Sequence, residues 1–290
     1  MVQMKASLMF RFQACLFRFS AGMLLAPLLF LVTPLDGKCA VPTGKTQALA
    51  AADNAFMSLN YSAADSLYKA MLVTCPENAD LYWKLARLNI SIAESINPDD
   101  SAKRMPYYTK AVDYAQKAVA IDSTNASCHT WYAAALAVKA DKTGAKEKVR
   151  RAAEIKRELD KALALNPHDD VAWSILGSYH HQISNIGWFS RLVGSTFIGG
   201  MPEGNRKAAE HAFKKAISLN PRAIRHFYEL ALLYMDEGRK EEALQILQAA
   251  SKKPVLMKGD VRRLEEIHEL IRKLSTTENA PPTIDGSGSL

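Results

Sequence analysis

The sequence predicts an all-α fold, a superhelix of about five antiparallel helix pairs with a capping helix at its C-terminal end. Ala, Leu, Lys and Glu dominate the middle of the chain, and only 14 Gly and 12 Pro occur among 290 residues, so most segments favour helix. A pattern of small and large residues recurs along the chain, and prolines follow several of the expected helices at comparable positions.

The packing pattern is most complete between Ile224 and Ala250. Offsets 4, 7, 8, 11, 15, 20, 24 and 27 of a unit that starts at Ile224 hold Phe227, Leu230, Ala231, Tyr234, Gly238, Ala243, Leu247 and Ala250. These are the packing positions of the 34-residue tetratricopeptide repeat, in which small residues let two antiparallel helices approach closely and large residues fill the space between them. The segment therefore predicts one tetratricopeptide-like helix pair.

Four further pairs fit upstream in the same frame. They end at Pro76, Ser123, Pro167 and Pro221, and a proline there stops one helix and turns the chain into the next. These markers are 47, 44 and 54 residues apart, so the units between them exceed the repeat by roughly 13, 10 and 20 residues. We expect the first excess, AESINPDDSAKRM, to form a loop, and a long helix from about Lys142 to Leu165 to absorb the second.

The third excess, residues 184–205, reads SNIGWFSRLVGSTFIGGMPEGN and is rich in large apolar residues. On a helical wheel one face carries Ile186, Phe189, Leu192, Val193 and Phe197, with Trp188 at its margin. We therefore expect a short amphipathic helix that ends at Gly199-Gly200. This insertion either covers core that the stretched unit leaves open or contacts a ligand through Trp188, Phe189 and Arg191.

Residues 1–40 differ in composition from the rest of the chain. Lys5, Arg11 and Arg18 precede the apolar run AGMLLAPLLFLV, which is the form of a secretory signal peptide and predicts export to the periplasm or the outside of the cell. An uncleaved membrane anchor and a mitochondrial presequence are the two alternatives. Without residues 1–40 the net charge falls from +7 to +4, because four bases and one acid are lost, and this balance does not indicate nucleic-acid binding.

The remaining chain divides into a repeat domain over residues 45–274 and a tail over 275–290. The segment DVRRLEEIHELIRKL predicts an amphipathic helix that caps the exposed end of the array, as a solenoid requires. The tail sequence TTENAPPTIDGSGSL predicts disorder.

Stacked first helices of such units line a concave groove, which is the candidate binding surface. In the repeat frame the groove positions hold aromatic, basic and small polar residues: Trp83, Arg87, Ser174, His181, Arg225 and Tyr228. The aromatic rings offer flat apolar contact, and the arginines can hold a carboxylate or a phosphate. We expect a protein or peptide partner, with a phospholipid or a membrane surface as the alternative.

No motif in the sequence indicates an enzyme. His180 and His181 are neighbours on a helix and point about 100° apart, so they cannot chelate one metal together. The segment around His268 is not HExxH, no CxxC occurs, and FIGGMPEGNRK lacks the spacing of a phosphate-binding loop. We therefore expect no catalytic residues, no cofactor and no metal.

Three segments resemble one known family. HTWYAAALAVK, IKRELDKALALNPHDDVAWSILGSYH and NIGWFSRLVGSTFIGGMPEGNRKAAEHAFKKAISLNP are similar to the tetratricopeptide domain of the regulator of microtubule dynamics family, and the resemblance covers roughly Tyr108 to Leu274. It implies a non-enzymatic, membrane-associated adaptor, since eukaryotic members are linked to microtubules and organelle membranes. It also implies a lipid-binding role as the alternative.

Overall fold

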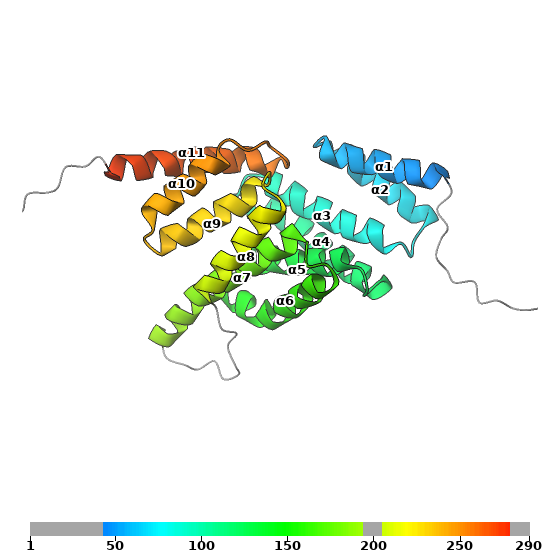
Figure 1. Ribbon diagram of the computed structural model, residues 1–290. Coiled ribbons are helices and arrows are strands. Elements are labelled where there is room, and N and C mark those ends of the chain that lie inside the picture. Colours follow the sequence, from blue (N-terminus) through cyan, green and yellow to red (C-terminus); the bar gives the residue numbers. More distant parts are fainter. Residues whose placement is uncertain (1–42, 194–204, 279–290) are drawn as a thin grey trace, which may run out of the picture. The chain divides into compact units, whose positions relative to one another are not determined.

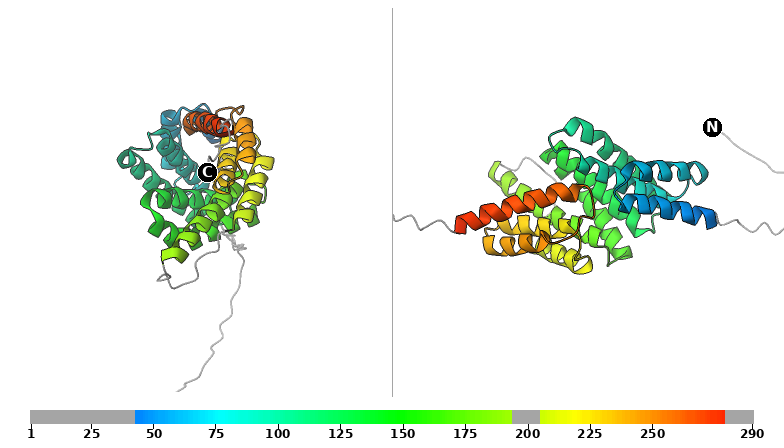
Figure 2. Two further views of the ribbon diagram at one scale, coloured as in Figure 1. Left: turned by 90° about the vertical axis from the view of Figure 1, so that its left-hand side faces the viewer. Right: turned by 90° about the horizontal axis from the view of Figure 1, so that it is seen from above.

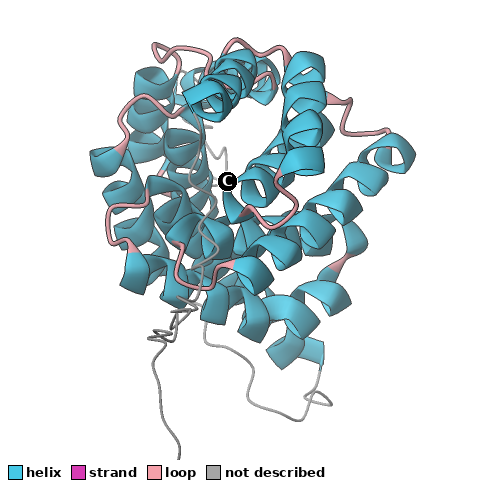
Figure 3. Cartoon of the chain, turned by 90° about the vertical axis from the view of Figure 1, so that its right-hand side faces the viewer, coloured by secondary structure: helices cyan, strands magenta, loops and turns pink. Residues whose placement is uncertain are grey.

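Eleven α-helices joined by short connections make up the part of the chain that the computed structural model describes, residues 43–193 and 205–278 (Figures 1 and 3). All of them belong to one compact unit, residues 40–290. The helices are α1 (Thr43–Met57), α2 (Tyr61–Thr74), α3 (Ala79–Ser95), α4 (Ser101–Ile121), α5 (Ala126–Thr143), α6 (Ala145–Leu165), α7 (Asp170–Val193), α8 (Arg206–Leu219), α9 (Ile224–Asp236), α10 (Lys240–Ala250) and α11 (Gly259–Glu278). The predicted all-α fold of five helix pairs followed by a C-terminal helix is confirmed.

Consecutive helices pack as antiparallel pairs, from α1 with α2 to α9 with α10. The first helices of successive pairs also touch one another. α3 packs on α5, α5 on α7 and α7 on α9 (Figure 2). This row forms the inner wall of the superhelix. α11 covers α9 and α10 and also reaches α3.

Alanines allow the close approach within each pair. Side chains fully buried at the predicted small positions include Ala64, Ala86, Ala115, Ala162, Ala209, Ala216, Ala231, Ala243 and Ala250. Larger residues fill the space around them, among them Phe213 and Leu247, both fully buried. The small-large pattern read from the sequence is therefore the packing pattern of the fold.

Asparagine and aspartate start most of the described helices. The side chains of Asn78, Asn125 and Asn205 accept hydrogen bonds from backbone N–H groups in the first turns of α3, α5 and α8, and Asp100 does the same for α4. Each satisfies a donor that has no partner within the helix. These caps fix where each helix begins.

The excess residues lengthen helices more than loops. The predicted loop AESINPDDSAKRM is mostly helical, because α3 continues to Ser95 and α4 starts at Ser101 behind its Asp100 cap. The long helix expected to end at Leu165 is α6, and α5 runs on to Thr143 before it. In the third excess, residues 184–193 continue α7 without a break instead of forming a separate helix, and residues 194–204 lie outside the described part of the chain.

Both ends of the chain also lie outside the described residues. The predicted targeting segment, residues 1–40, and positions 279–290 of the predicted tail are therefore still predictions. The described helices begin at Thr43 and end at Glu278, so residues 275–278 of the predicted tail belong to α11.

Candidate functional site

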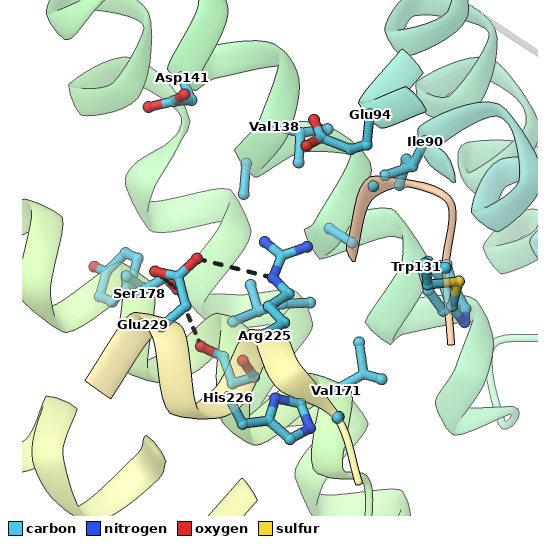
Figure 4. Close-up of a pocket in the computed structure, with 18 of the residues that line it drawn as sticks. Ile90, Glu94, Trp131, Val138, Asp141, Val171, Ser178, Arg225, His226 and Glu229 are labelled. Carbon is cyan, nitrogen blue, oxygen red and sulfur yellow. Dashed lines mark hydrogen bonds and ion pairs between the residues drawn. The ribbon is translucent and has the colours of Figure 1, made fainter. Parts of the chain in front are cut away.

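A cavity of about 360 Å³ lies on the concave side of the inner helices. Its walls come from α3, α5, α6, α7, α9, the segment between α10 and α11, and the start of α11 (Figure 4). This volume is near the lower end of the range of about 300 to 1,000 Å³ that ligand pockets span. The groove predicted from the repeat is thus partly enclosed.

The segment from Ser251 to Arg263, here called the strap, forms one wall of the cavity with Leu256, Met257, Gly259, Asp260 and Arg263. Within the strap, Asp260 is 3% exposed, and its Oδ2 accepts hydrogen bonds from the N–H groups of Leu256 and Met257 at 3.0 and 2.9 Å. Arg263 lies 2.6 Å from the other carboxylate oxygen of Asp260. These bonds shape the turn that leads into α11 and put Leu256 and Met257 on the cavity wall.

Hydrogen bonds join the strap to the opposite side of the groove. The N–H of Lys258 donates to the hydroxyl of Tyr61 on α2 at 3.1 Å, and Arg262 Nη1 donates to the carbonyl of Glu94 on α3 at 3.0 Å. Gly259 packs so closely there that an added Cβ would lie 3.4 Å from the Glu94 carbonyl oxygen. The last helix therefore spans the groove from the fifth pair back to the first two.

Glu94, whose carbonyl binds Arg262 of the strap, is itself held in place by hydrogen bonds. Its carboxylate accepts hydrogen bonds from Arg104 at 2.8 Å and from the Tyr108 hydroxyl. Burial opposes ionisation of Glu94, but the Tyr108 hydrogen bond and the nearby Arg225 and Arg104 outweigh it and hold its pKa below the ordinary value. A charged Glu94 is therefore part of the folded state at neutral pH.

Most of the cavity wall is apolar. The inner faces of α3, α5, α6 and α7 contribute Ile90, Trp131, Ala134, Ala137, Val138, Ala152, Ile155, Val171, Ile175 and Ile183. These side chains come from the groove positions and their neighbours in several units, so the wall is continuous along the array. Such a surface binds the apolar part of a ligand.

One end of the cavity is polar and lies at the first turns of α7 and α9. Asp170 on α7 and His226 on α9 are joined through Asp170 Oδ2 and His226 Nε2 at 2.8 Å, and the side chain of Asn220 donates to the same oxygen at 3.0 Å. Burial raises the pKa of Asp170, but the bonds from His226 and Asn220 outweigh it and hold the pKa below its usual value. Ser174, one turn after Asp170, and Arg225 complete this end of the wall.

Two of the predicted groove residues, Ser174 and Arg225, line the cavity. His181 instead joins α7 to α9, with Nε2 2.7 Å from Asp236 Oδ2. Tyr228 is half-buried between α9 and α11, and burial together with the nearby Glu266 raises the pKa of its hydroxyl. These two side chains stabilise helix packing and do not line the cavity.

Trp83 and Arg87 form a separate group on α3. The Arg87 guanidinium lies 3.9 Å from the ring centre of Phe56 on α1 and 5.3 Å from that of Trp83. The Trp83 indole N–H donates to Asp80 at 2.8 Å. The predicted insertion residues Trp188, Phe189 and Arg191 lie in the last turns of α7, and their side chains are outside the described set.

The sequence did not identify His226, Asp170 or Trp131 as cavity residues. Trp131 belongs to the WYA motif that carries the family resemblance, and it lies on the cavity wall beside Ala134 and Val138 of the same helix. His226 follows Arg225 in the sequence and is not at a groove position of the repeat frame. It reaches the end of the cavity because it lies in the first turn of α9.

Other kinds of site receive no support from the described residues. No group of three or more His, Cys, Asp or Glu in residues 43–193 and 205–278 could hold a metal ion. None of the helices in this part of the chain is both long enough and apolar enough to span a membrane. Burial raises the pKa of the Cys128 thiol to about 12, so this cysteine is unreactive at neutral pH.

Comparison with known proteins decides the family. The model of regulator of microtubule dynamics proteins 1 to 3 matches residues 48–275. The chain belongs to the regulator of microtubule dynamics family. This confirms the resemblance expected from the WYA motif and the insertion, and it extends the match to nearly the whole described region.

Two members of the regulator of microtubule dynamics family show how far the likeness extends. Mouse regulator of microtubule dynamics protein 1 is 28% identical over 159 residues, which are 55% of this chain and 50% of the mouse protein. The bovine protein 1 is 26% identical over 204 residues, or 69% of this chain and 63% of the relative. The chain thus spans between half and 63% of the length of these relatives.

Solved structures support the fold of this family member. A thermophilic tetratricopeptide-repeat protein of Thermus thermophilus has a TM-score of 0.56 at 16% identity, covering 80% of this chain and 98% of that one. The type IV pilus biogenesis factor PilW has a TM-score of 0.50 at 16% identity, covering 81% and 92%. At such low identity the likeness shows the tetratricopeptide superhelix alone.

Proposed function

We propose that this protein is a non-enzymatic binding protein that holds a lipid-like amphiphile in the cavity of its superhelix. The observation that carries this proposal is the strap, which places Leu256 and Met257 on the cavity wall and is bonded to Tyr61 and Glu94 across the groove. A peptide lying along the inner helices would have to displace the strap, whereas an apolar chain fits beneath it. The mainly apolar wall favours such a chain.

Native mass spectrometry of the purified protein tests this function. We expect a bound amphiphile to be retained from the expressing cell, or to be acquired from phosphatidylcholine or fatty-acid micelles. Ala137 lines the cavity and is partly buried, so Ala137→Phe fills the space and should abolish this binding. Ala50→Phe, at an exposed position on α1, is the matched control and should bind as the unchanged protein does. A protein that stays free of ligand under all these conditions contradicts the proposal.

A second candidate is the protein or peptide adaptor, and one observation favours it. Trp83 lies outside the cavity and is only partly buried, with Lys84 Nζ 4.6 Å and the Arg87 guanidinium 5.3 Å from its ring centre. An aromatic ring between two cations suits an acidic peptide that carries an apolar anchor. Selection from a random peptide library should then enrich peptides on the unchanged protein and not on Trp83→Ala. Equal enrichment on both proteins excludes this surface.

Export of the chain is proposed from residues 1–40 alone. The relatives are named for regulating microtubule dynamics, and an exported protein would not meet tubulin. N-terminal sequencing of the protein isolated from its own cell distinguishes the two: a start near Val41 supports export, and an intact N-terminus contradicts cleavage of a signal peptide.

A further inference from the structure

We propose that the polar end of the cavity, formed by Ser174, Arg225 and His226, binds the carboxyl group of a single-chain fatty acid. This inference rests on the proposed function, because it assigns the class of amphiphile that the cavity takes. Its basis is a pair of buried polar atoms that have no hydrogen-bond partner among the described residues, together with one loosely paired cation on the same cavity wall.

The two unpartnered atoms are Ser174 Oγ and His226 Nδ1. Ser174 is 2% exposed and His226 is 3% exposed, and neither atom has a hydrogen-bond partner among the described residues. Buried polar atoms are nearly always paired, and leaving one unpaired costs about 1–3 kcal/mol. Both residues line the same cavity, so a polar group of a ligand can satisfy both atoms.

The fold holds these two residues close together. Asp170 begins α7, Ser174 follows it by one helical turn, and His226 Nε2 is 2.8 Å from Asp170 Oδ2. The contact with Asp170 uses Nε2 of the ring, which leaves Nδ1 for a ligand. His226 also belongs to the first turn of α9, where the helix dipole favours a negative charge.

Arg225 supplies the charge for an anion. Its closest carboxylate is that of Glu229, with 3.9 Å between Arg225 Nε and Glu229 Oε1 (Figure 4). The other cavity cations are held more tightly, since Lys148 and Arg263 each lie 2.6 Å from an aspartate oxygen. Arg225 is therefore the cation of this wall best able to exchange its partner for a ligand, and a guanidinium matches the two oxygens of a carboxylate.

The charges around the site favour a single negative charge. The acidic groups on the same cavity wall are Glu94 on α3, Asp141 on α5, Asp170 on α7, Glu229 on α9 and Asp260 on α11. Lys148 is already paired with Asp141, and Arg263 with Asp260. A phosphate monoester carries about −1.5 to −2 at neutral pH and would leave charge unmatched among these acids. A carboxylate brings one charge, and a cavity near the small end of the ligand range suits one chain.

Three hydrogen bonds complete the complex. Arg225 donates to one carboxyl oxygen, the Ser174 hydroxyl donates to the carboxyl group, and the second oxygen meets His226 Nδ1 with one proton between them. The fatty acid is ionised in neutral solution, so this shared proton is taken up from solvent when the ligand binds. The chain then lies along the apolar wall toward Ile155 and Ile183.

Isothermal titration calorimetry with palmitate, its methyl ester and acetate tests the site. We expect palmitate to bind, the methyl ester to bind about tenfold more weakly, and acetate not to bind, because the site needs both the carboxyl group and the chain. In buffers that differ in ionisation enthalpy, palmitate should take up about one proton on binding, in keeping with linkage between protonation and binding.

Variants assign the effect to the named residues. Ser174→Ala and Arg225→Gln should each weaken palmitate binding about tenfold, and they should bind palmitate and its ester nearly equally. His226→Gln should abolish the proton uptake. Ser184→Ala is the matched control, because Ser184 lies on the same helix but not on the cavity wall, and its hydroxyl already donates to the His181 carbonyl at 2.7 Å. Circular dichroism verifies that each variant is folded.

The outcomes separate this inference from the proposed function. The carboxylate site is wrong if the methyl ester binds the unchanged protein as tightly as palmitate, or if Ser184→Ala weakens binding as much as Ser174→Ala. Binding of phosphatidylcholine without binding of palmitate also overturns the site but keeps the amphiphile function. When neither palmitate, its ester nor phosphatidylcholine binds, the proposed function itself fails.

Discussion

Gly177 shows how a single residue sets the distance between two helices. It lies in α7 at a predicted small position, and a Cβ placed there would be 2.6 Å from the ring of the fully buried Phe213 on α8. Gly177→Ala should therefore destabilise the protein by about 1–3 kcal/mol, because the ring must shift in a packed core. Urea denaturation measures the loss.

A second substitution checks this cause. Phe213→Leu removes the ring that the added methyl group would meet, so the double variant Gly177→Ala, Phe213→Leu should lose less stability than the sum of the single variants. Additive losses would mean that the contact with Phe213 is not the reason for the glycine.

A buried hydrogen-bonded pair, His129 on α5 and Glu158 on α6, offers another test at the scale of residues. His129 Nδ1 is 2.6 Å from Glu158 Oε2, and His129 Nε2–H donates to the Ser123 carbonyl at 2.9 Å. The two side chains are 1% and 4% exposed. His129→Leu leaves a buried carboxylate without this partner and should cost on the order of 3 kcal/mol in thermal or chemical denaturation. The double variant with Glu158→Leu should recover much of this loss, and equal losses in both would contradict the pairing.

The helices themselves were largely predictable, because each carries its own small-large pattern and most follow an asparagine or aspartate cap. Their lengths were less so: Asp100 starts α4 inside the expected loop, and α7 runs through the start of the insertion. Among the residues that line the cavity, the repeat frame predicted Ser174 and Arg225, because the position of a residue in the repeat fixes which face of the helix carries its side chain. It did not predict His226 or the strap, which depend on how far the superhelix curves and so on contacts between distant segments.

A substitution at Arg262 should weaken the attachment of the strap. Arg262 Nη1 donates to the Glu94 and Ile96 carbonyls at 3.0 and 3.4 Å, and Arg262→Ala removes both bonds. We expect a loss of about 1.5–3 kcal/mol in the local free energy of opening, seen as faster amide hydrogen exchange in residues 251–263. Lys252→Ala, at an exposed position of the same segment, is the control. Unchanged exchange in Arg262→Ala would show that these two bonds do not hold the strap closed.

The molecule as a whole should lose stability in acid. The pKa values of Glu94, Asp141 and Asp170 are all held below their ordinary values, although burial acts in the opposite direction at each. A carboxyl group with a lowered folded pKa stabilises the fold above its unfolded pKa of about 4, and this contribution disappears as the pH falls through the folded value. The free energy of unfolding in urea should thus be nearly constant from pH 7 to 5 and should fall steadily below about pH 4. Glu94→Gln should reduce the slope, and a stability that does not change down to pH 3 would contradict the assignment.

The contacts of the strap also change how the array can unfold. In an open solenoid each repeat touches only its neighbours, so the ends can fray while the middle stays folded. Here Lys258 is bonded to Tyr61 across 197 residues, and Arg262 to Glu94 across 168. Such ties raise the contact order and couple the terminal repeats to each other, which predicts slow folding and one cooperative transition in place of stepwise fraying. A chain of repeats closed in this way behaves thermodynamically as a globular domain.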